Sequence, residues 1–174
     1  MQAQRYLTTD SGNVICKTNQ IKGSKFIVIG GKTQIENAVE IRGDMSPDGQ
    51  PIVAIGRYCF FGPSSSLIPP VREERAYPLK IGSFVYVGEN SKIQAATIGS
   101  HVVIESDVQI GEFAIIKDCV VIRKGSKIPP FAVVAPHSIV EPRGRVTELP
   151  ESGRPAIELY CRQLLAGLSL DPPF

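Results

Sequence analysis

In the second half of the chain, an aliphatic side chain recurs at every sixth position. The series begins at Ile98, ends at Val140 and contains no residue other than Ile or Val. Its members are Ile98, Ile104, Ile110, Ile116, Ile122, Ile128, Val134 and Val140. This spacing is typical of the hexapeptide units of a parallel β-helix.

The same register continues upstream, with interruptions. One step shrinks to five residues between Ile93 and Ile98, and two gaps of 14 residues separate Ile41 from Ile55 and Leu67 from Ile81. The upstream anchors are Ile29, Ile35, Ile41, Ile55, Phe61, Leu67, Ile81, Val87 and Ile93. Because the register resumes after each gap, we expect two excursion loops, 42–54 and 68–80, that leave the β-helix without shifting it.

The physical basis of the pattern is stacking. Three hexapeptides close one triangular coil, and each anchor lies on the equivalent anchor of the next coil, about 4.8 Å away. The chain holds 20 isoleucines and 16 valines, whose stiff side chains suit such layers. Corners need small residues or positive φ, which is consistent with the many Gly, Ser and Ala residues. The prediction is an all-β chain that forms a single-stranded parallel β-helix.

The period ends after Val140, and a proline-rich run follows. We therefore divide the chain into a β-helix domain, 1–146, and a linker with a C-terminal α-helix, 147–174. Residues with helical spacing define the apolar face of this helix: Ile157, Tyr160, Cys161, Leu164, Leu165 and Leu168. The helix either packs along the β-helix or makes a subunit contact.

Composition excludes several classes of function. The net charge is +2 and no basic block is present, so a nucleic-acid partner is not expected. The four cysteines are scattered without a CxxC pair, which is typical of a reduced compartment. No apolar run is long enough to insert into a membrane. The expected location is the cytoplasm.

The two histidines, His101 and His137, are 36 residues apart, which equals two coils. They should therefore occupy one column and lie too far apart to share a metal ion. We expect both to be solvated on the surface. The alternative is that one acts as the general base of an acyltransferase.

A second set of motifs resembles the γ-class carbonic anhydrases, which are hexapeptide β-helix enzymes. These are Arg42-Gly43-Asp44, Ile55-Gly56 and the segment 87–99 with its shortened step. In the enzymes this pattern carries three histidine ligands, which fall here on Ile68, Glu89 and Gln94. The resemblance thus implies a lost metal site and no cofactor. It also implies a structural role for the pair Arg42 and Asp44.

The order of motifs along the whole chain is similar to that of the pointed-end β-helix subunits of dynactin. These motifs are YLTTDSGN, GGKT, RGD, PP…PLKIG, IGSHV and VTELPES. The resemblance implies a left-handed β-helix with no catalytic residue. It also implies a sister β-helix subunit, an actin-related protein and other pointed-end subunits as partners, together with a cytoskeletal location and a link from dynein to cargo such as endosomes.

Loop 68–80 is the expected contact site for cargo adaptors. Its candidate partner-binding residues are Arg72, Glu73, Glu74, Arg75 and Tyr77. The alternative is a solvated loop of alternating charge. For the whole chain, the alternative to an adaptor subunit is a hexapeptide enzyme, either a degenerate carbonic anhydrase or an acyltransferase.

Overall fold

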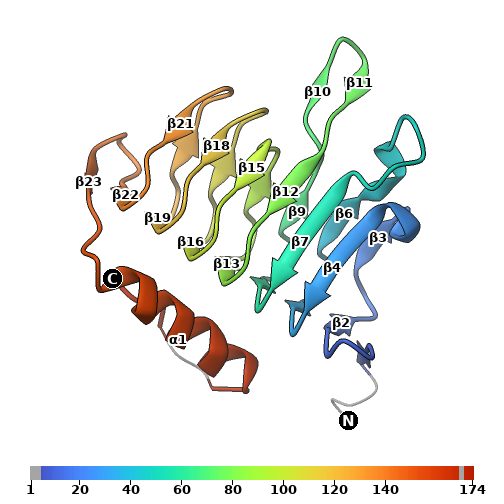
Figure 1. Ribbon diagram of the computed structural model, residues 1–174, viewed down its shortest axis with the longest axis horizontal. Coiled ribbons are helices and arrows are strands. Elements are labelled where there is room, and N and C mark those ends of the chain that lie inside the picture. The colour runs from blue at the N-terminus through green and yellow to red at the C-terminus, as the bar shows by residue number, and fades with distance from the viewer. Residues whose placement is uncertain (1–4, 169–170) are drawn as a thin grey trace.

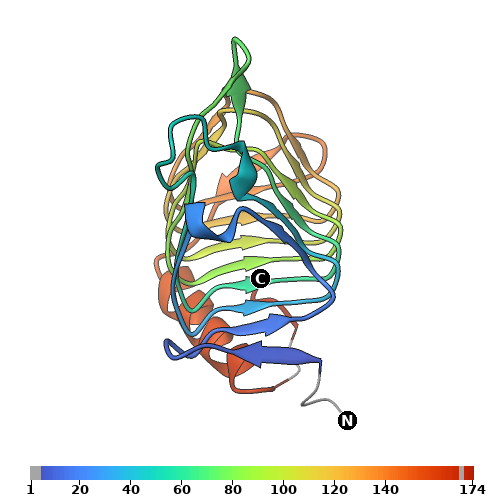
Figure 2. The same ribbon diagram turned by 90° about the vertical axis from the view of Figure 1, so that its right-hand side faces the viewer.

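The computed structural model describes residues 5–168 and 171–174. Within this part of the chain, the strands form three stacked sheets, here called A, B and C, and a separate hairpin. The backbone visits A, B and C in turn, so each round makes one coil of a parallel β-helix (Figures 1 and 2). The prediction of this fold is confirmed.

The strands are short, as the hexapeptide unit requires. Sheet A comprises β1 (Tyr6–Thr8), β2 (Val14–Cys16), β5 (Gln34–Ile35), β8 (Phe60–Phe61), β13 (Val85–Val87), β16 (Val102–Ile104), β19 (Val120–Ile122), β22 (Ser138–Val140) and β23 (Val146–Glu148). Sheet B comprises β3 (Gln20–Lys22), β6 (Glu40–Arg42), β9 (Ser66–Leu67), β14 (Lys92–Ile93), β17 (Gln109–Ile110) and β20 (Lys127–Ile128). Sheet C comprises β4 (Ile27–Gly31), β7 (Val53–Arg57), β12 (Leu79–Ile81), β15 (Thr97–Ile98), β18 (Ile115–Ile116) and β21 (Val133–Val134).

The anchors predicted from the period form three continuous columns in the core, which Ile15 and Ile21 extend by one coil. In sheet C, for example, Ile98 is paired with Ile81 on one side and Ile116 on the other. The column of sheet A runs Ile15, Ile35, Phe61, Val87, Ile104, Ile122, Val140. The column of sheet B runs Ile21, Ile41, Leu67, Ile93, Ile110, Ile128. Burial of these side chains supplies most of the apolar core.

The corners have the positive φ expected of them, and they are not confined to small residues. In most coils the residue three positions after an anchor adopts positive φ, and it is often large, as at Tyr58, Phe84 and Phe113. These side chains lie outside the core, where they stack on the equivalent rings of neighbouring coils. Small residues follow one position later and are buried, as Ser91, Ala114 and Ser126 show.

Both ends of sheet A finish with an antiparallel strand. β1 pairs with β2 at the first coil, and β23 pairs with β22 at the last. These strands cover edges that would otherwise offer unpaired backbone groups to other chains. Strand β23 extends to Glu148, two residues beyond the expected end of the β-helix domain.

Both excursions leave the β-helix at the same corner, between sheets B and C. The first contains a 3-10 turn, Gly43–Met45, and rejoins sheet C at Val53. The second contains an antiparallel hairpin, β10 (Val71–Arg72) and β11 (Arg75–Ala76), and rejoins sheet C at Leu79. The hairpin projects well beyond the coils (Figure 1).

The C-terminal helix, α1 (Gly153–Leu165), packs along the β-helix. Its buried residues Ile157, Tyr160 and Cys161 form a second apolar cluster with Val103 and Val121 of sheet A. The prediction that Leu168 extends this helical face is wrong, because the helix ends at Leu165 and Leu168 is exposed. Among the described residues, no helix is long and apolar enough to cross a membrane.

Candidate interaction surfaces

The three positions that match metal ligands in the enzymes offer a poor donor set. Ile68 follows β9 and carries no donor atom, and Glu89 is exposed in the turn after β13. The side-chain amide of Gln94 donates a hydrogen bond to Glu112 over 3.4 Å. Within residues 5–168 and 171–174, no group of three His, Cys, Asp or Glu side chains is placed to hold a metal. These residues do not fit the three-ligand zinc site of the enzymes.

The expectation that His101 is solvated is wrong. Its side chain is only 8% exposed because α1 covers it, and its Nε2 atom lies 3.1 Å from Oε2 of Glu158. His137 occupies the same corner column and is exposed, as expected. The difference arises because α1 passes over one coil and not the other.

An aromatic ladder leads away from His101 along this corner. The rings of Tyr58 and Phe84 stack at 5.1 Å, and Phe84 stacks on His101 at the same distance. The guanidinium of Arg162 lies 4.5 Å from the Tyr58 ring centroid and 5.2 Å from that of Phe84. A cation over aromatic faces is attracted by their quadrupoles, so Arg162 holds α1 to the ladder.

The candidate adaptor-binding residues lie on the β10–β11 hairpin or next to it. Arg72, Glu73, Glu74 and Arg75 are exposed at its tip, where Glu73 and Glu74 both have positive φ. A carboxylate oxygen of Asp48, in the first excursion, lies 3.4 Å from Nη2 of Arg75. The ion pair is exposed and contributes little stability, but it joins the two excursions into one surface.

Tyr77 lies apart from this charged tip. Its ring meets Phe113 edge-on at 5.6 Å, and Phe113 stacks on Phe131 at 5.4 Å. Phe131 is 63% exposed, and Val133 beside it is 62% exposed. The sequence pattern did not reveal this aromatic group, although Phe113 and Phe131 are separated by the length of one coil.

Arg42 and Asp44 form the pair expected from the RGD motif. Two nitrogens of Arg42 donate to the carboxylate of Asp44 over 2.9 and 3.1 Å, and these bonds lower the pKa of Asp44. Between them, a Cβ at Gly43 would lie 2.5 Å from the carbonyl oxygen of Gly23 in the preceding coil. Glycine is therefore required for close stacking of these turns, and the structural role of the pair stays a prediction.

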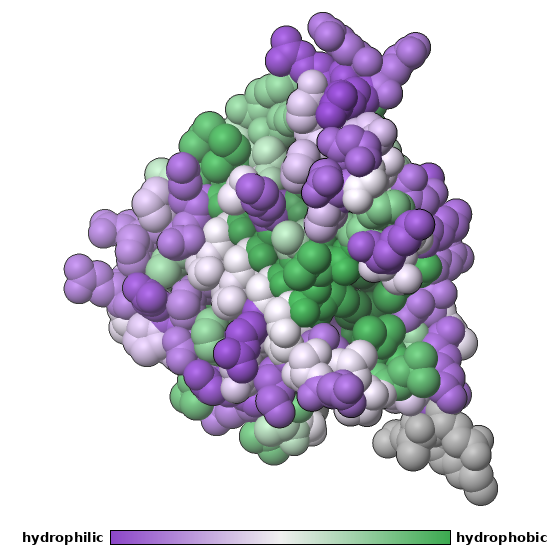
Figure 3. Space-filling model, turned by 45° about the vertical axis from the view of Figure 1, so that its right-hand side comes forward, coloured by the Kyte–Doolittle hydropathy of each residue, from purple (hydrophilic) through white to green (hydrophobic). Residues whose placement is uncertain are grey.

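The first coil is less protected than the others. Its core-facing side chains Ile15, Ile21 and Ile29 are only partly buried, whereas Val134 and Val140 at the other end are at most 9% exposed. Figure 3 shows hydrophobic side chains gathered on the N-terminal side of the molecule. Such a patch is typical of a surface that another protein covers.

Solved structures confirm the fold. A hexapeptide transferase family protein from Anaplasma phagocytophilum is 16% identical, with a TM-score of 0.61 over 88% of this chain and 89% of that one. The acetyltransferase domain of PglB from Neisseria gonorrhoeae FA1090, in complex with acetyl coenzyme A, is 10% identical, with a TM-score of 0.55 over 79% of this chain and 57% of that one. The chain is thus a hexapeptide-repeat protein with a left-handed parallel β-helix.

Sequence comparison gives the family. The family model of Dynactin subunit 5 matches residues 1–159. The chain belongs to the dynactin subunit 5 family. Dynactin subunit 5 of Dictyostelium discoideum is 33% identical over 103 residues, which are 57% of this chain. The match spans half of that relative's own length.

Proposed function

We propose that the protein is a non-catalytic structural subunit of dynactin. Its expected neighbours are a sister β-helix subunit, an actin-related protein and the other pointed-end subunits, in the cytoplasm and on the cytoskeleton. The observation that carries the proposal is the family match over residues 1–159. The partly exposed first coil supports it, because a subunit of an assembly has such a surface to cover.

The enzyme alternative keeps one argument in its favour, the acetyltransferases among the fold neighbours. Fold alone does not carry chemistry. Here the side chain at 68 is apolar, and the imidazole of His101 is buried beneath α1, away from an acceptor hydroxyl in solvent.

Depletion followed by complementation tests the assembly role. Cells depleted of the protein should show dynactin that sediments as a smaller particle, and the full chain should restore the normal particle. A chain with Ile68→His, Glu89→His and Gln94→His should restore assembly equally well if these positions carry no chemistry. Normal sedimentation of dynactin after complete depletion would contradict the proposal.

We further propose that the β10–β11 hairpin contacts cargo adaptors and links dynein–dynactin to cargo such as endosomes. The hairpin presents four charged side chains on a rigid support, which is where recognition residues commonly lie. Replacement of Arg72, Glu73, Glu74 and Arg75 by Ala should leave dynactin assembled and slow cargo movement. As a control, Lys117→Ala and Lys127→Ala remove exposed charges from the C-terminal half of the β-helix. If the hairpin variant moves cargo at the wild-type rate, the hairpin does not bind adaptors.

A further inference from the structure

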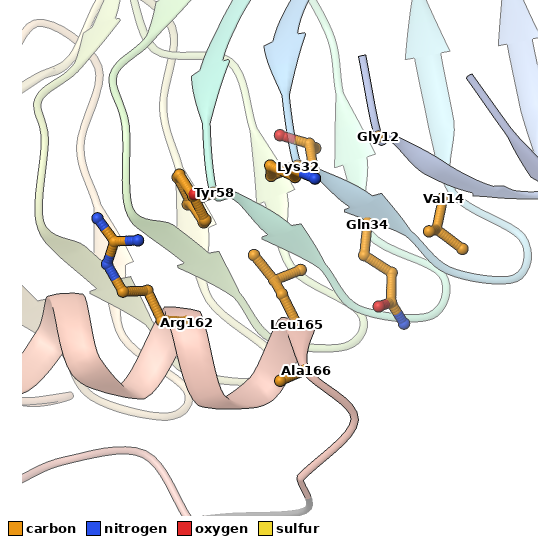
Figure 4. Close-up of a pocket in the computed structure, with 9 residues that line it drawn as sticks. Gly12, Val14, Lys32, Gln34, Tyr58, Arg162, Leu165 and Ala166 are labelled. Carbon is orange, nitrogen blue, oxygen red and sulfur yellow. The ribbon is translucent and has the colours of Figure 1, made fainter. Parts of the chain in front are cut away.

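A groove lies between the last turn of α1 and the first coils of the β-helix. It has a volume of about 280 Å³ and is open to solvent. Its floor includes Val14 and Gln34 of sheet A, and Leu165 of α1 and Ala166, directly after the helix, also line it (Figure 4). The groove exists because the apolar contacts of α1 are concentrated near its middle, at Ile157, Tyr160 and Cys161, and loosen towards its end.

Cationic groups surround this groove. Lys32 and Arg162 line it, and the guanidinium of Arg57 lies 5.9 Å from the ring centroid of Tyr58, which also lines it. In the described part of the chain, no carboxylate forms an ion pair with Lys32 or Arg57. The local field is therefore positive and only partly neutralised.

Two nearby acidic side chains, Glu158 and Glu36, are already engaged. Glu158 contacts both His101 and Arg162. Glu36 accepts hydrogen bonds from Gln34 and from the hydroxyl of Tyr6, which is why the pKa of Tyr6 rises to about 12. Neither carboxylate is available to Lys32.

α1 supplies a partner to the rings of this corner column from His101 to Tyr58, but no counter-charge to Lys32. Glu158 faces His101, and one turn later Arg162 faces Phe84 and Tyr58. One further turn along, Ala166 lines the groove together with Lys32, and its methyl group offers no counter-charge. Of the described C-terminal residues, Asp171 and Pro172 line a different pocket, beside Tyr86 and Glu105.

We propose that this groove binds an acidic, extended peptide segment of a partner protein. A glutamate or aspartate carboxylate would lie among Lys32, Arg57 and Arg162, where charge-assisted hydrogen bonds are strong. An aliphatic side chain beside it would lie against Val14 and Leu165. The site is distinct from the β10–β11 hairpin, and it stands whether or not the assembly role is correct.

The test uses the full chain and a short fluorescein-labelled peptide that alternates leucine and glutamate, followed by fluorescence polarisation. Binding should saturate and weaken as salt is added. Lys32→Asn removes one charge at a backbone φ of +52°, which asparagine adopts readily, so the fold should be retained. This variant should bind about tenfold more weakly. The matched control is Lys92→Asn on the outer face of sheet B, which should bind like the wild type.

Two further peptides decide the chemistry. If a peptide with glutamine in place of glutamate binds equally well, the proposed role of the carboxylate is wrong. If a peptide with phosphoserine binds more tightly than the glutamate peptide, the groove is a phosphopeptide site and the proposal fails. Equal affinity of the wild type and the double variant Lys32→Asn, Arg57→Gln, with circular dichroism unchanged, would also overturn it.

Discussion

The Nε2 atom of His101 lies 3.1 Å from the Oε2 atom of Glu158, and this contact ties a corner of the β-helix to the C-terminal helix. His101 is buried beneath the helix, stacked on Phe84, while Glu158 also contacts Arg162. The helix is therefore fixed by an apolar cluster on one side and by polar and aromatic contacts on the other.

The first prediction concerns this contact and pH. The hydrogen bond from His101 is the main reason that the pKa of Glu158 is lowered, and Arg162 adds to the effect. A carboxyl with a lowered pKa in the folded state stabilises the fold above its unfolded pKa of about 4.3, and the stabilisation is lost as the pH falls through the folded value. Glu158→Gln should therefore lose less stability than the wild type between pH 6 and pH 3, measured by urea denaturation. The control is Glu74→Gln, in the exposed hairpin, which should lose as much stability between pH 6 and pH 3 as the wild type does. If Glu158→Gln also loses as much as the wild type, the Glu158 carboxylate does not contribute this stability.

The second prediction separates the two faces of α1. Ile157 is fully buried and Leu159 is 56% exposed, although they are only two residues apart. Ile157→Ala should lower the free energy of unfolding by about 2–5 kcal/mol. Leu159→Ala should change it by less than about 0.5 kcal/mol. Equal effects in chemical denaturation would show that the helix is packed by a different face.

A third prediction follows from the thiol on the same helix. Cys161 is fully buried, and burial raises its pKa to about 12, so it should react slowly with a thiol reagent at neutral pH. In Ile157→Ala, opening of the helix should become more frequent and the reaction faster. Mass spectrometry of the modified peptide would locate the label. If Cys161 of the wild-type chain reacted as fast as a cysteine in a short unstructured peptide, the buried packing of this thiol would be wrong.

The fourth prediction concerns the core columns. Ile104 is a fully buried anchor, whereas Val133 faces out of sheet C and is 62% exposed. Ile104→Ala should cost about 2–5 kcal/mol of stability, and Val133→Ala should cost less than about 0.5 kcal/mol. Urea unfolding monitored by circular dichroism gives both values. A larger cost for Val133 would place the inward register one residue away from the anchors.

The fifth prediction concerns the turn of the hairpin. Glu73 and Glu74 have φ of 51° and 63°, a pair of left-handed residues for which Asn-Gly is preferred. The double variant Glu73→Asn, Glu74→Gly should therefore stabilise the hairpin by about 1 kcal/mol. Slower hydrogen exchange of the amides in β10 and β11 is the readout. Glu73→Gln with Glu74→Gln, which removes the charges only, should not slow exchange to the same degree.

The sequence predicts the β-helix well because its period is set by the stacking of identical layers. Each anchor from Ile29 to Val140 lies in the column that the period assigns to it. The first coil lies within the predicted β-helix, but its anchors Ile15 and Ile21 were not assigned, because eight residues separate Ile21 from Ile29 and the turn Ser24–Phe26 breaks the step. The β10–β11 hairpin escaped because its strands are two residues long and show no alternation.

The surface was less predictable, for a physical reason. His101 and His137 hold equivalent positions in the repeat, and only the path of α1 distinguishes them. The groove beside Lys32 likewise depends on where α1 ends. The pattern of apolar residues extended the helix to Leu168, whereas it ends at Leu165. The repeat pattern reports contacts between coils, so it does not predict where a helix packs on the outside of the β-helix.

The most direct test of the central proposal is native mass spectrometry of the tagged full chain, purified gently from cells that produce it. The proposed role predicts that the chain is found in one particle with a second β-helix subunit and an actin-related protein, without a stoichiometric metal ion on this chain. A homotrimer that carries zinc in proportion to its subunits, with no other dynactin subunit present, would contradict the proposal.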